Sequence, residues 1–321
     1  MIEIIDKKKI KKHQTNSKWR KIIKQRYLWL LSLPGVFLVF IFNYMPMAGI
    51  YMAFTNYSPS REGFIVDLIR APFVGWDWFS YFFQGDFTII MRNTLAMSIL
   101  TLIFSFPIPI AIAVLINEVR VKWIKKGIQT VSYLPYFISW VIAANIFLTF
   151  FSGNGVINNF LQALNITTTD IYFFQEGRYF WWILAIANTW KGMGYNAIIY
   201  IAAISGINPE QYEAADVDGA SRWQKIVNIT LPSLKPTIVI LLILAIGGVL
   251  NTGFEQVLLL QNNSILNYSE VLDTYAYRYG LQNGMYSYGA AVGLFKSVVS
   301  FILVVTANKI SRKVNDDGGL F

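Results

Sequence analysis

Six segments of this 321-residue chain are apolar over the length that a helix needs to cross a bilayer. The hydrocarbon core is roughly 30 Å thick, and about 20 helical residues span it. The residues are 55% hydrophobic and 14% charged, a composition that is not typical of soluble globular domains. We therefore predict an all-α polytopic membrane protein with six transmembrane helices, at approximately 28–53, 93–117, 131–151, 180–204, 235–260 and 288–308.

The lysines and arginines indicate how these helices are oriented. Twenty of them lie in the two terminal tails and in the connections around 118–130 and 205–235, against five on the opposite side. Because positively charged loops are retained in the cytoplasm, both termini and the connection that contains Glu213 are predicted to be cytoplasmic. The net charge of +9 therefore indicates orientation and contact with anionic membrane lipid, and it does not indicate nucleic-acid binding.

The chain lacks the residues that disulfides, cysteine- or histidine-based metal sites and ATP-binding P-loops require. The chain has no cysteine and a single histidine, His13, so disulfides are excluded and a cysteine- or histidine-based metal site has almost nothing to build with. The pattern G-x-x-x-x-G-K-[ST] is absent, so no P-loop for ATP is predicted. We expect no cofactor in this chain and no catalytic residues. If transport is driven by ATP, a separate ATPase must bind the ATP and Mg. The first apolar run is longer than the core of a cleaved signal peptide, so we expect it to be retained.

A long polar connection, residues 208–236, separates two strongly apolar segments. Asn208 followed by Pro209 predicts the start of a short helix, with Gln211 placed to complete a capping box. Asp218 and Gly219 predict its end, and Ser221 can cap a second short helix that Pro232 interrupts. In that second helix Trp223, Ile226 and Val227 share one face. Two short helices that meet at a glycine form a bent element that can project from the membrane and fit a groove on a soluble protein.

The spacing within this connection is particular. Glu213-Ala214-Ala215 is followed by three residues, then Gly219, then nine residues, then Ile229-Thr230-Leu231-Pro232. This pattern resembles the EAA loop in the permease subunits of ATP-binding-cassette importers. The resemblance implies that a separate ATPase contacts the connection, with Glu213 available to pair with a basic residue. The residues implied in this coupling are Glu213, Ala214, Ala215, Asp218, Gly219, Ala220, Ser221, Arg222 and Trp223.

Other motifs extend the resemblance from about residue 28 to the C-terminus. They are Phe73-Val74-Gly75, Arg92-Asn93-Thr94, Trp190-Lys191-Gly192-Met193-Gly194 and Gly293-Leu294-Phe295-Lys296-Ser297. Together they resemble the polysaccharide and oligosaccharide branch of sugar-importer permeases, the LplB and YteP type, which is related to the maltose-importer permeases. The resemblance implies a type I importer architecture in the bacterial cytoplasmic membrane. It also implies four partners: a second homologous permease in a heterodimer, an ABC ATPase dimer, an extracytoplasmic solute-binding lipoprotein, and an oligosaccharide substrate.

Four segments are predicted along the chain. Residues 1–27 form a basic cytoplasmic tail, and residues 28–92 hold the first transmembrane helix and an extracytoplasmic loop. Residues 93–310 form a five-helix permease core that contains the coupling connection, and residues 311–321 are a second cytoplasmic tail. The loop from Thr55 to Arg92 is long enough to carry one or two short helices.

Charged and amide side chains inside predicted spans are candidates for the transport path, because charges in a bilayer are costly and usually face a cavity or a partner. Aromatic rings cover the apolar faces of sugars, and amides and charges bond their hydroxyls. Lysines also favour acidic sugars, such as those of pectin or alginate. An equal alternative is that each charged residue forms a salt bridge without touching solute. The candidate path residues are Trp190, Lys191, Tyr195, Asn196, Asn251, Phe254, Glu255 and Lys296.

Two other functions remain open from the residues alone. Lys191, Glu255 and Lys296 could serve proton coupling in a secondary transporter driven by an ion gradient, although no repeated halves are visible. A membrane scaffold without transport activity is the third possibility.

Overall fold

The computed structural model describes residues 24–314 and divides into two compact units after Tyr51. The described residues are almost entirely helical, and their β structure is limited to one bridge between Thr55 and Phe73. The all-α prediction is therefore confirmed. Most of the predicted basic tail, including His13, and the chain beyond Val314 lie outside the described residues.

The first unit carries the predicted first span as a continuous run of helix. It comprises α2 (Arg26–Val39), the π-helical turn η1 (Phe40–Tyr44) and the 3₁₀ segment η2 (Met45–Phe54), whose end belongs to the second unit. Pro46 has no backbone N–H to donate, and the π turn directly before it is a local adjustment that tolerates such a residue. None of the side chains of α2 is buried within the chain, so this apolar helix needs lipid or another subunit around it.

The second unit begins with the loop that was expected to hold short helices. It contains two, α3 (Phe64–Arg70) and α4 (Asp77–Gln84), as predicted. The second span follows as α5 (Phe87–Ser105) and α6 (Pro107–Glu118), which together form one apolar run of 32 residues. Pro107 stands at the first position of α6, where its missing N–H costs little.

The third predicted span, 131–151, is wrong as a single helix. The structure has α7 (Lys122–Phe137) and α8 (Trp140–Phe150), which meet at 99°. Ile138 adopts an extended backbone, and the hydroxyl of Ser139 accepts a hydrogen bond from the backbone N–H of Ile142 to cap α8. The apolar run concealed this break because Ser132 and Asn145 in the same run are also good capping residues, so Ser139 did not stand out.

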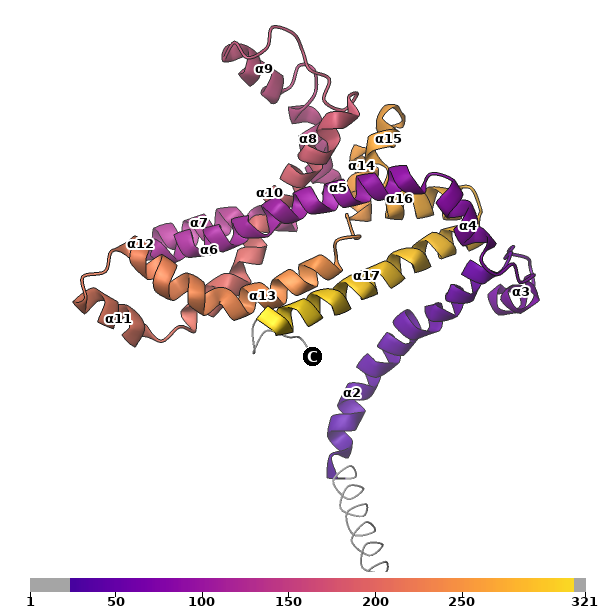
Figure 1. Ribbon diagram of the computed structural model, residues 1–321, viewed down its shortest axis with the longest axis horizontal. Helices are drawn as coiled ribbons and strands as arrows, with labels where there is room; N and C mark the ends of the chain where they lie inside the picture. The colour runs from indigo at the N-terminus through magenta and orange to yellow at the C-terminus, as the bar shows by residue number, and fades with distance from the viewer. Residues whose placement is uncertain (1–23, 315–321) are drawn as a thin grey trace, which may run out of the picture. The chain divides into compact units, whose positions relative to one another are not determined.

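A 29-residue helix, α10 (Gly177–Ser205), forms the centre of the second unit. It follows α9 (Val156–Ala163) and packs against α5, α6 and α7 (Figure 1). At Gly194 an added Cβ would lie 2.0 Å from the backbone oxygen of Ser132, so α10 and α7 touch through backbone here. The glycine is required by this close approach.

The polar connection and the fifth span form α11 (Pro209–Val217), α12 (Arg222–Lys225), the π turn η3 (Ile226–Thr230) and α13 (Leu231–Gly247). The prediction that the fifth span runs to residue 260 is wrong. α13 ends at Gly247, and a separate helix, α14 (Phe254–Leu260), begins after Gly253, whose φ is +87°. Glycine adopts this left-handed backbone without the steric cost that other residues meet, so the chain turns here.

The last part of the unit contains four short segments and one long helix. The short segments are η4 (Asn263–Ile265), α15 (Leu266–Ser269), α16 (Leu272–Tyr277) and the π turn η5 (Arg278–Gln282). The long helix, α17 (Tyr286–Val314), contains the predicted sixth span and runs beside α13 in Figure 1. The continuous run from Arg222 to Gly247, which ends in α13, and the run Tyr286–Arg312 of α17 are each long and apolar enough to cross a membrane.

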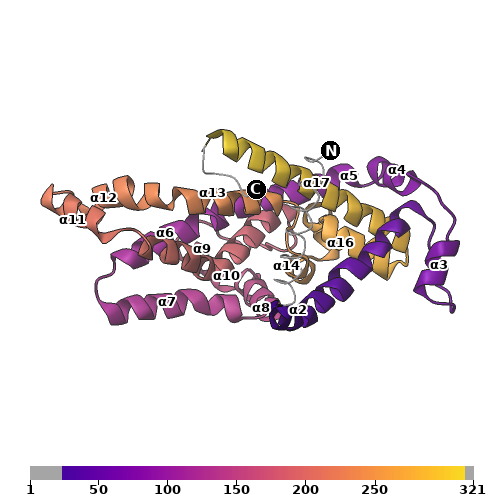
Figure 2. The ribbon, with the colours of Figure 1, turned by 90° about the horizontal axis from the view of Figure 1, so that it is seen from below.

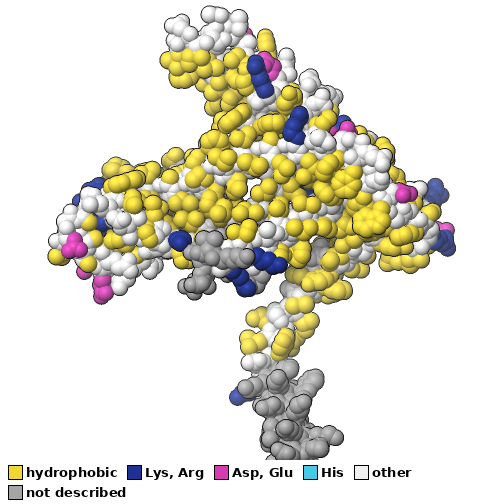
Figure 3. All heavy atoms as spheres, in the orientation of Figure 1, with side chains coloured by type: hydrophobic (Ala, Val, Ile, Leu, Met, Phe, Trp, Pro, Cys, Tyr) yellow, Lys and Arg dark blue, Asp and Glu magenta, His cyan; other side chains and the backbone are white. Residues whose placement is uncertain are grey.

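Among residues 24–314, four helices meet that length and hydropathy, or five spans if the bent pair α7 and α8 counts as one. α10 is long enough but is not among them, so the count of six stays a prediction. Figure 2 agrees with Figure 1 in placing α11, α12 and the start of α7 at one end of the second unit, with α3 and α4 towards the other. Hydrophobic side chains cover the middle of the face seen in Figure 3, and charges lie over α11 and α12 and near α3.

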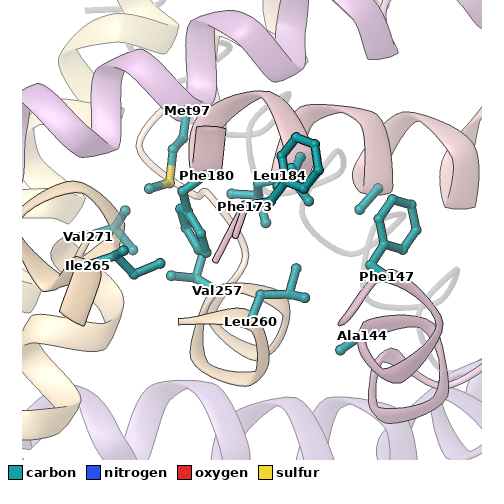
Figure 4. Packing of buried hydrophobic residues seen from close by; sticks show 12 residues of the cluster. Met97, Ala144, Phe147, Phe173, Phe180, Leu184, Val257, Leu260, Ile265 and Val271 are labelled. Atoms are coloured by element: carbon teal, nitrogen blue, oxygen red, sulfur yellow. The ribbon is translucent and has the colours of Figure 1, made fainter. Parts of the chain in front are cut away.

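The largest buried cluster joins the bent pair to the centre of the unit. It contains Phe180 and Leu184 of α10, Phe147 of α8 and Val257 of α14, and Phe180 stands beside Val257 in Figure 4. Inside a bilayer such a cluster is held by close van der Waals packing, because lipid chains are as apolar as these side chains. This cluster fixes α14 and α8 against α10, and these three helices carry most of the predicted path residues.

Candidate coupling segment and transport path

The segment 208–236, here called the coupling segment, begins as its sequence predicts. Asn208 caps α11 by accepting a hydrogen bond from the N–H of Glu210, and Pro209 is the first helical residue. The side chain of Asn208 bonds to the carboxylate of Glu210, at 3.1 Å, so the predicted pairing with Gln211 is wrong. α11 ends at Asp218 and Gly219, where φ is +73°.

The second helix starts as predicted but does not stop where predicted. Ser221 and Gln224 form a complete capping box at its start. Pro232 does not interrupt the helix, because the π turn at 226–230 lets the N–H of Leu231 bond to the carbonyl of Ile226, one residue further back than in an α-helix. That widening accommodates the proline, and the chain continues without a break from Arg222 to Gly247. A movement of the coupling segment is therefore passed directly to α13.

Two contacts brace the two helices of the coupling segment against each other. The ammonium of Lys225 pairs with the carboxylate of Asp216, and the hydroxyls of Tyr212 and Thr230 lie 2.9 Å apart in a hydrogen bond. The tip stays open: Glu213 is exposed, the side chain of Val217 is 89% exposed, and that of Trp223 is 70% exposed. Large apolar side chains exposed beside charges on a rigid bend are characteristic of a docking surface for another protein.

Two of the predicted path residues lie together. Asn196 of α10 and Asn251, in the turn after α13, line one cavity of about 310 Å³ between α5, α6, α10 and α13. Ser98 and Thr252 also line it, and their buried hydroxyl oxygens have no hydrogen-bond partner among the described residues. Buried polar atoms without a partner are uncommon in proteins, and they mark this cavity as a place for a hydrated or hydroxyl-rich ligand.

Lys191 and Tyr195 lie at the bend between α7 and α8. The ammonium of Lys191 donates to the backbone oxygens of Tyr136, at 2.7 Å, of Pro135, at 3.3 Å, and of Ile138. The ring of Tyr195 stacks on that of Tyr136 with centroids 3.7 Å apart. A cation at the end of a helix satisfies carbonyls that have no partner in the helix, so Lys191 stabilises the bend whatever it does for solute.

Trp190, Phe254 and Lys296 are separate from both groups, whereas the carboxylate of Glu255 lies within electrostatic reach of the Lys191 ammonium. Trp190 packs edge to face on Phe147 in the buried cluster, with centroids 5.8 Å apart. Phe254 and Glu255 lie exposed in the first turn of α14, and Glu255 forms none of the ion pairs seen among residues 24–314. Lys296 of α17 pairs with Asp273 of α16 at 2.5 Å. The structure thus divides the predicted residues into several places, and contact with solute stays a prediction for each.

Sequence reasoning missed Asp273 and the hydroxyls that line the cavity. Asp273 lies outside the predicted spans, so a search for charges within spans could not find it. Ser98, Thr101 and Thr252 are small polar residues in apolar surroundings. The available signal was their spacing, because Ser98 and Thr101 stand three residues apart on one face of α5.

Residues 105–316 match the model of a family described as the binding-protein-dependent transport system inner membrane component. The chain belongs to this family. The match covers about two thirds of the residues and includes the coupling segment, α10, α13 and α17. The chain is therefore a multi-pass membrane permease of the ATP-binding-cassette importer class.

Known relatives resemble the permease over almost its whole length. Protein LplB of Bacillus subtilis is 42% identical over 94% of this chain and 93% of its own. The polygalacturonan/rhamnogalacturonan transport system permease protein YteP of the same organism is 39% identical over 93% of this chain and 91% of its own.

Solved structures give the same result. A bacterial ABC transporter that imports the acidic polysaccharide alginate contains a chain that is 40% identical, with a TM-score of 0.82 over 92% of the permease and 99% of that chain. A second crystal structure, of a bacterial alginate ABC transporter in complex with its pentasaccharide-bound periplasmic protein, matches with a TM-score of 0.83 over 94% and 99%. These similarities confirm the predicted importer architecture and favour it over an ion-driven transporter or a scaffold.

Proposed function

We propose that this permease is one of two membrane subunits in an importer that carries acidic oligosaccharides, with energy from a separate ATPase dimer and solute from an extracytoplasmic binding protein. The observation that carries the proposal is the coupling segment. Its exposed tip is joined without a break to α13, and α13 ends at the cavity that holds Asn251. A push on the tip when the ATPase closes therefore reaches the wall of the cavity.

The cavity suits part of a sugar chain. The amides of Asn196 and Asn251 can exchange hydrogen bonds with sugar hydroxyls. Apolar residues supply most of the rest of the lining, which matches the C–H faces of a pyranose ring, and Thr101, Ser105 and Tyr200 add further polar groups. No covalent chemistry on the sugar is required of the permease.

The acidic character of the solute is supported by the relatives. YteP is named for polygalacturonan and rhamnogalacturonan, and the solved transporters import alginate. The lysines of the path give weaker support than their sequence suggests. Backbone oxygens satisfy the Lys191 ammonium, and Asp273 balances the charge of Lys296. Relatives and cavity together therefore favour acidic oligosaccharides, but not a particular one.

Transport by purified components tests this proposal. The permease, its second permease, the ATPase and the binding protein are reconstituted in vesicles, and uptake of labelled oligogalacturonate is measured with ATP inside. Uptake is expected only when ATP, ATPase and binding protein are all present. Uptake that follows a proton gradient alone would contradict the proposal.

Two substitutions test the coupling segment. Gly219→Pro removes the left-handed turn, and Glu213→Lys reverses the exposed charge at the tip. Both are expected to detach or uncouple the ATPase while the spans still insert. Gly63→Pro is the matched control, because Gly63 also has a positive φ, +103°, and lies outside the coupling segment. Unchanged ATPase binding and transport in both coupling variants would refute the assignment.

A further inference from the structure

A second cavity, of about 400 Å³, lies away from the one that holds Asn196. Its walls come from α14, α16, η5, the start of α17 and Met52. These elements surround the ends of the first, fifth and sixth spans that are predicted to face outward. We call this cavity the Tyr277 pocket; the lining residues that matter here are Phe254, Asp273, Tyr277, Gly280, Tyr286 and Gly289.

Aromatic rings stand on the walls of the Tyr277 pocket. The rings of Phe254 and Tyr277 meet edge to face with centroids 5.1 Å apart, so each holds the other in position. Tyr286 is held in the same way by Tyr57, with centroids 6.1 Å apart and planes at 86°. Rings fixed by their neighbours offer apolar faces at little cost in side-chain entropy.

The floor of the pocket depends on two glycines. η5 and α17 approach so closely that a Cβ on Gly289 would lie 2.7 Å from the Cα of Gly280. Side chains at these positions would separate the two elements. The close approach brings the backbone of the two elements into the lining, beside the rings and the aliphatic side chains of Met52 and Leu281.

A single carboxylate, that of Asp273, lies in the lining, and it pairs with the Lys296 ammonium at 2.5 Å. Both side chains keep 20% of their surface exposed, and Asp273 brings the pair to the wall of the pocket. The ammonium has three N–H donors, and Asp273 is the one acceptor seen for it among the described residues. Lys296 therefore has donors left for a second anion.

We infer that the Tyr277 pocket is an entrance subsite for one uronate ring of an acidic oligosaccharide. The ring lies against Tyr277 and Phe254, its hydroxyls donate to the carboxylate of Asp273, and its own carboxylate accepts from Lys296. Exchange of Asp273 for the uronate at Lys296 leaves the ammonium neutralised, and the released carboxylate of Asp273 accepts hydrogen bonds from the sugar hydroxyls. This inference rests on the proposed function and adds a place and residues that recognise the sugar acid.

The experiment measures binding of labelled trigalacturonate to the complete reconstituted transporter, without ATP or binding protein. The neutral trisaccharide made by reducing its carboxylates is the comparison ligand. Lys296→Gln is expected to weaken trigalacturonate binding about tenfold, the effect of one charged hydrogen bond, and to change binding of the neutral ligand by less than about twofold. Tyr277→Ala is expected to weaken binding of both ligands. Tyr172 is an exposed tyrosine elsewhere in the chain, and Tyr172→Ala is expected to change binding of neither ligand.

Two further variants keep the result decisive. Asp273→Asn removes the anion that competes for Lys296 and is expected to strengthen trigalacturonate binding. If the ion pair is purely structural, the same variant would fail to assemble or would bind with unchanged affinity. Lys296→Arg keeps the charge and is expected to retain binding if Lys296→Gln fails to assemble. Equal effects on the acidic and neutral ligands would overturn the inference. Wild-type transporter that takes up no acidic oligosaccharide, even with ATP and binding protein, would instead refute the proposed function.

Discussion

Replacing Lys191 by methionine separates the two roles that this residue could have. Methionine keeps most of the length and apolar stem of lysine but cannot donate hydrogen bonds. In the variant, the backbone oxygens of Pro135, Tyr136 and Ile138 lose the ammonium that donates hydrogen bonds to them. These oxygens close α7 at its 99° bend towards α8.

The structure sets the size of the expected effect. A hydrogen bond to a charged group contributes about 1.5–3 kcal/mol, and a cation at a partly buried helix end up to about 2 kcal/mol. The three bonds share one ammonium, and Lys191 is partly exposed, so the contributions do not add in full. We expect Lys191→Met to lower the free energy of unfolding by about 2–3 kcal/mol.

Denaturant unfolding of the purified permease in detergent measures this change. Lys235→Met is the control, because Lys235 is exposed and forms none of the ion pairs seen among residues 24–314; it is expected to cost less than about 0.5 kcal/mol. Spin labels on α7 and α8 then report, through the distances between them, whether the distribution of angles between the two helices broadens. A Lys191→Met variant as stable as wild type, with altered oligosaccharide uptake, would refute the structural role and support direct contact with solute.

Three other changes have definite expected outcomes. Gly194→Ala forces a Cβ into the backbone of α7 and is expected to reduce the yield of folded protein, measured by size-exclusion chromatography. Gly293→Ala is the control, because the space around its Cβ is open, and it is expected to leave the yield unchanged. Equal yields for the two variants would contradict the close approach of α10 and α7. Ser221→Ala removes a capping box and is expected to lower the local stability of α12 by about 1 kcal/mol, which is measured as faster hydrogen exchange of its backbone amides. Unchanged exchange would show that the cap is dispensable. Hydrogen bonds from the hydroxyl and N–H of Ser60 hold the pKa of Asp67 below its ordinary value of 3.8. The contact therefore stabilises the loop fully at a pH above 3.8, and this stabilisation is lost as the pH falls through the lowered pKa. Carboxyl NMR titration is expected to show the pKa of Asp67 rise in Ser60→Ala, and an unchanged pKa would contradict the assignment.

The coupling segment shows how far local sequence signals reach. Asn208, Gly219 and Ser221 act through hydrogen bonds and backbone angles within a few residues, and the structure has each where the sequence places it. Pro232 was misjudged because its effect depends on the turn before it. A π turn absorbs the missing donor, and sequence patterns do not distinguish that turn from an ordinary helix.

The predicted path shows where local signals fail. Lys191 and Lys296 were correctly recognised as costly charges in apolar surroundings, but their partners are 53 and 23 residues away in the chain. The bend at Ile138 and the break after Gly247 were hidden inside apolar runs, because hydropathy averages over the few residues that end a helix. Asn196 and Asn251 meet in one cavity only because α10 and α13 pack beside each other.

The sequence by itself determined that this protein is a helical membrane permease with a coupling segment. Apolar length, positive charge and helix caps are each properties of a short stretch of chain, so they can be recognised without knowledge of the fold. The tertiary structure alone decided which polar groups share a cavity, which charges are already neutralised, and how the coupling segment is joined to the cavity wall. Those relations are set by packing between distant helices, where a glycine such as Gly194 or Gly289 fixes how closely two backbones approach.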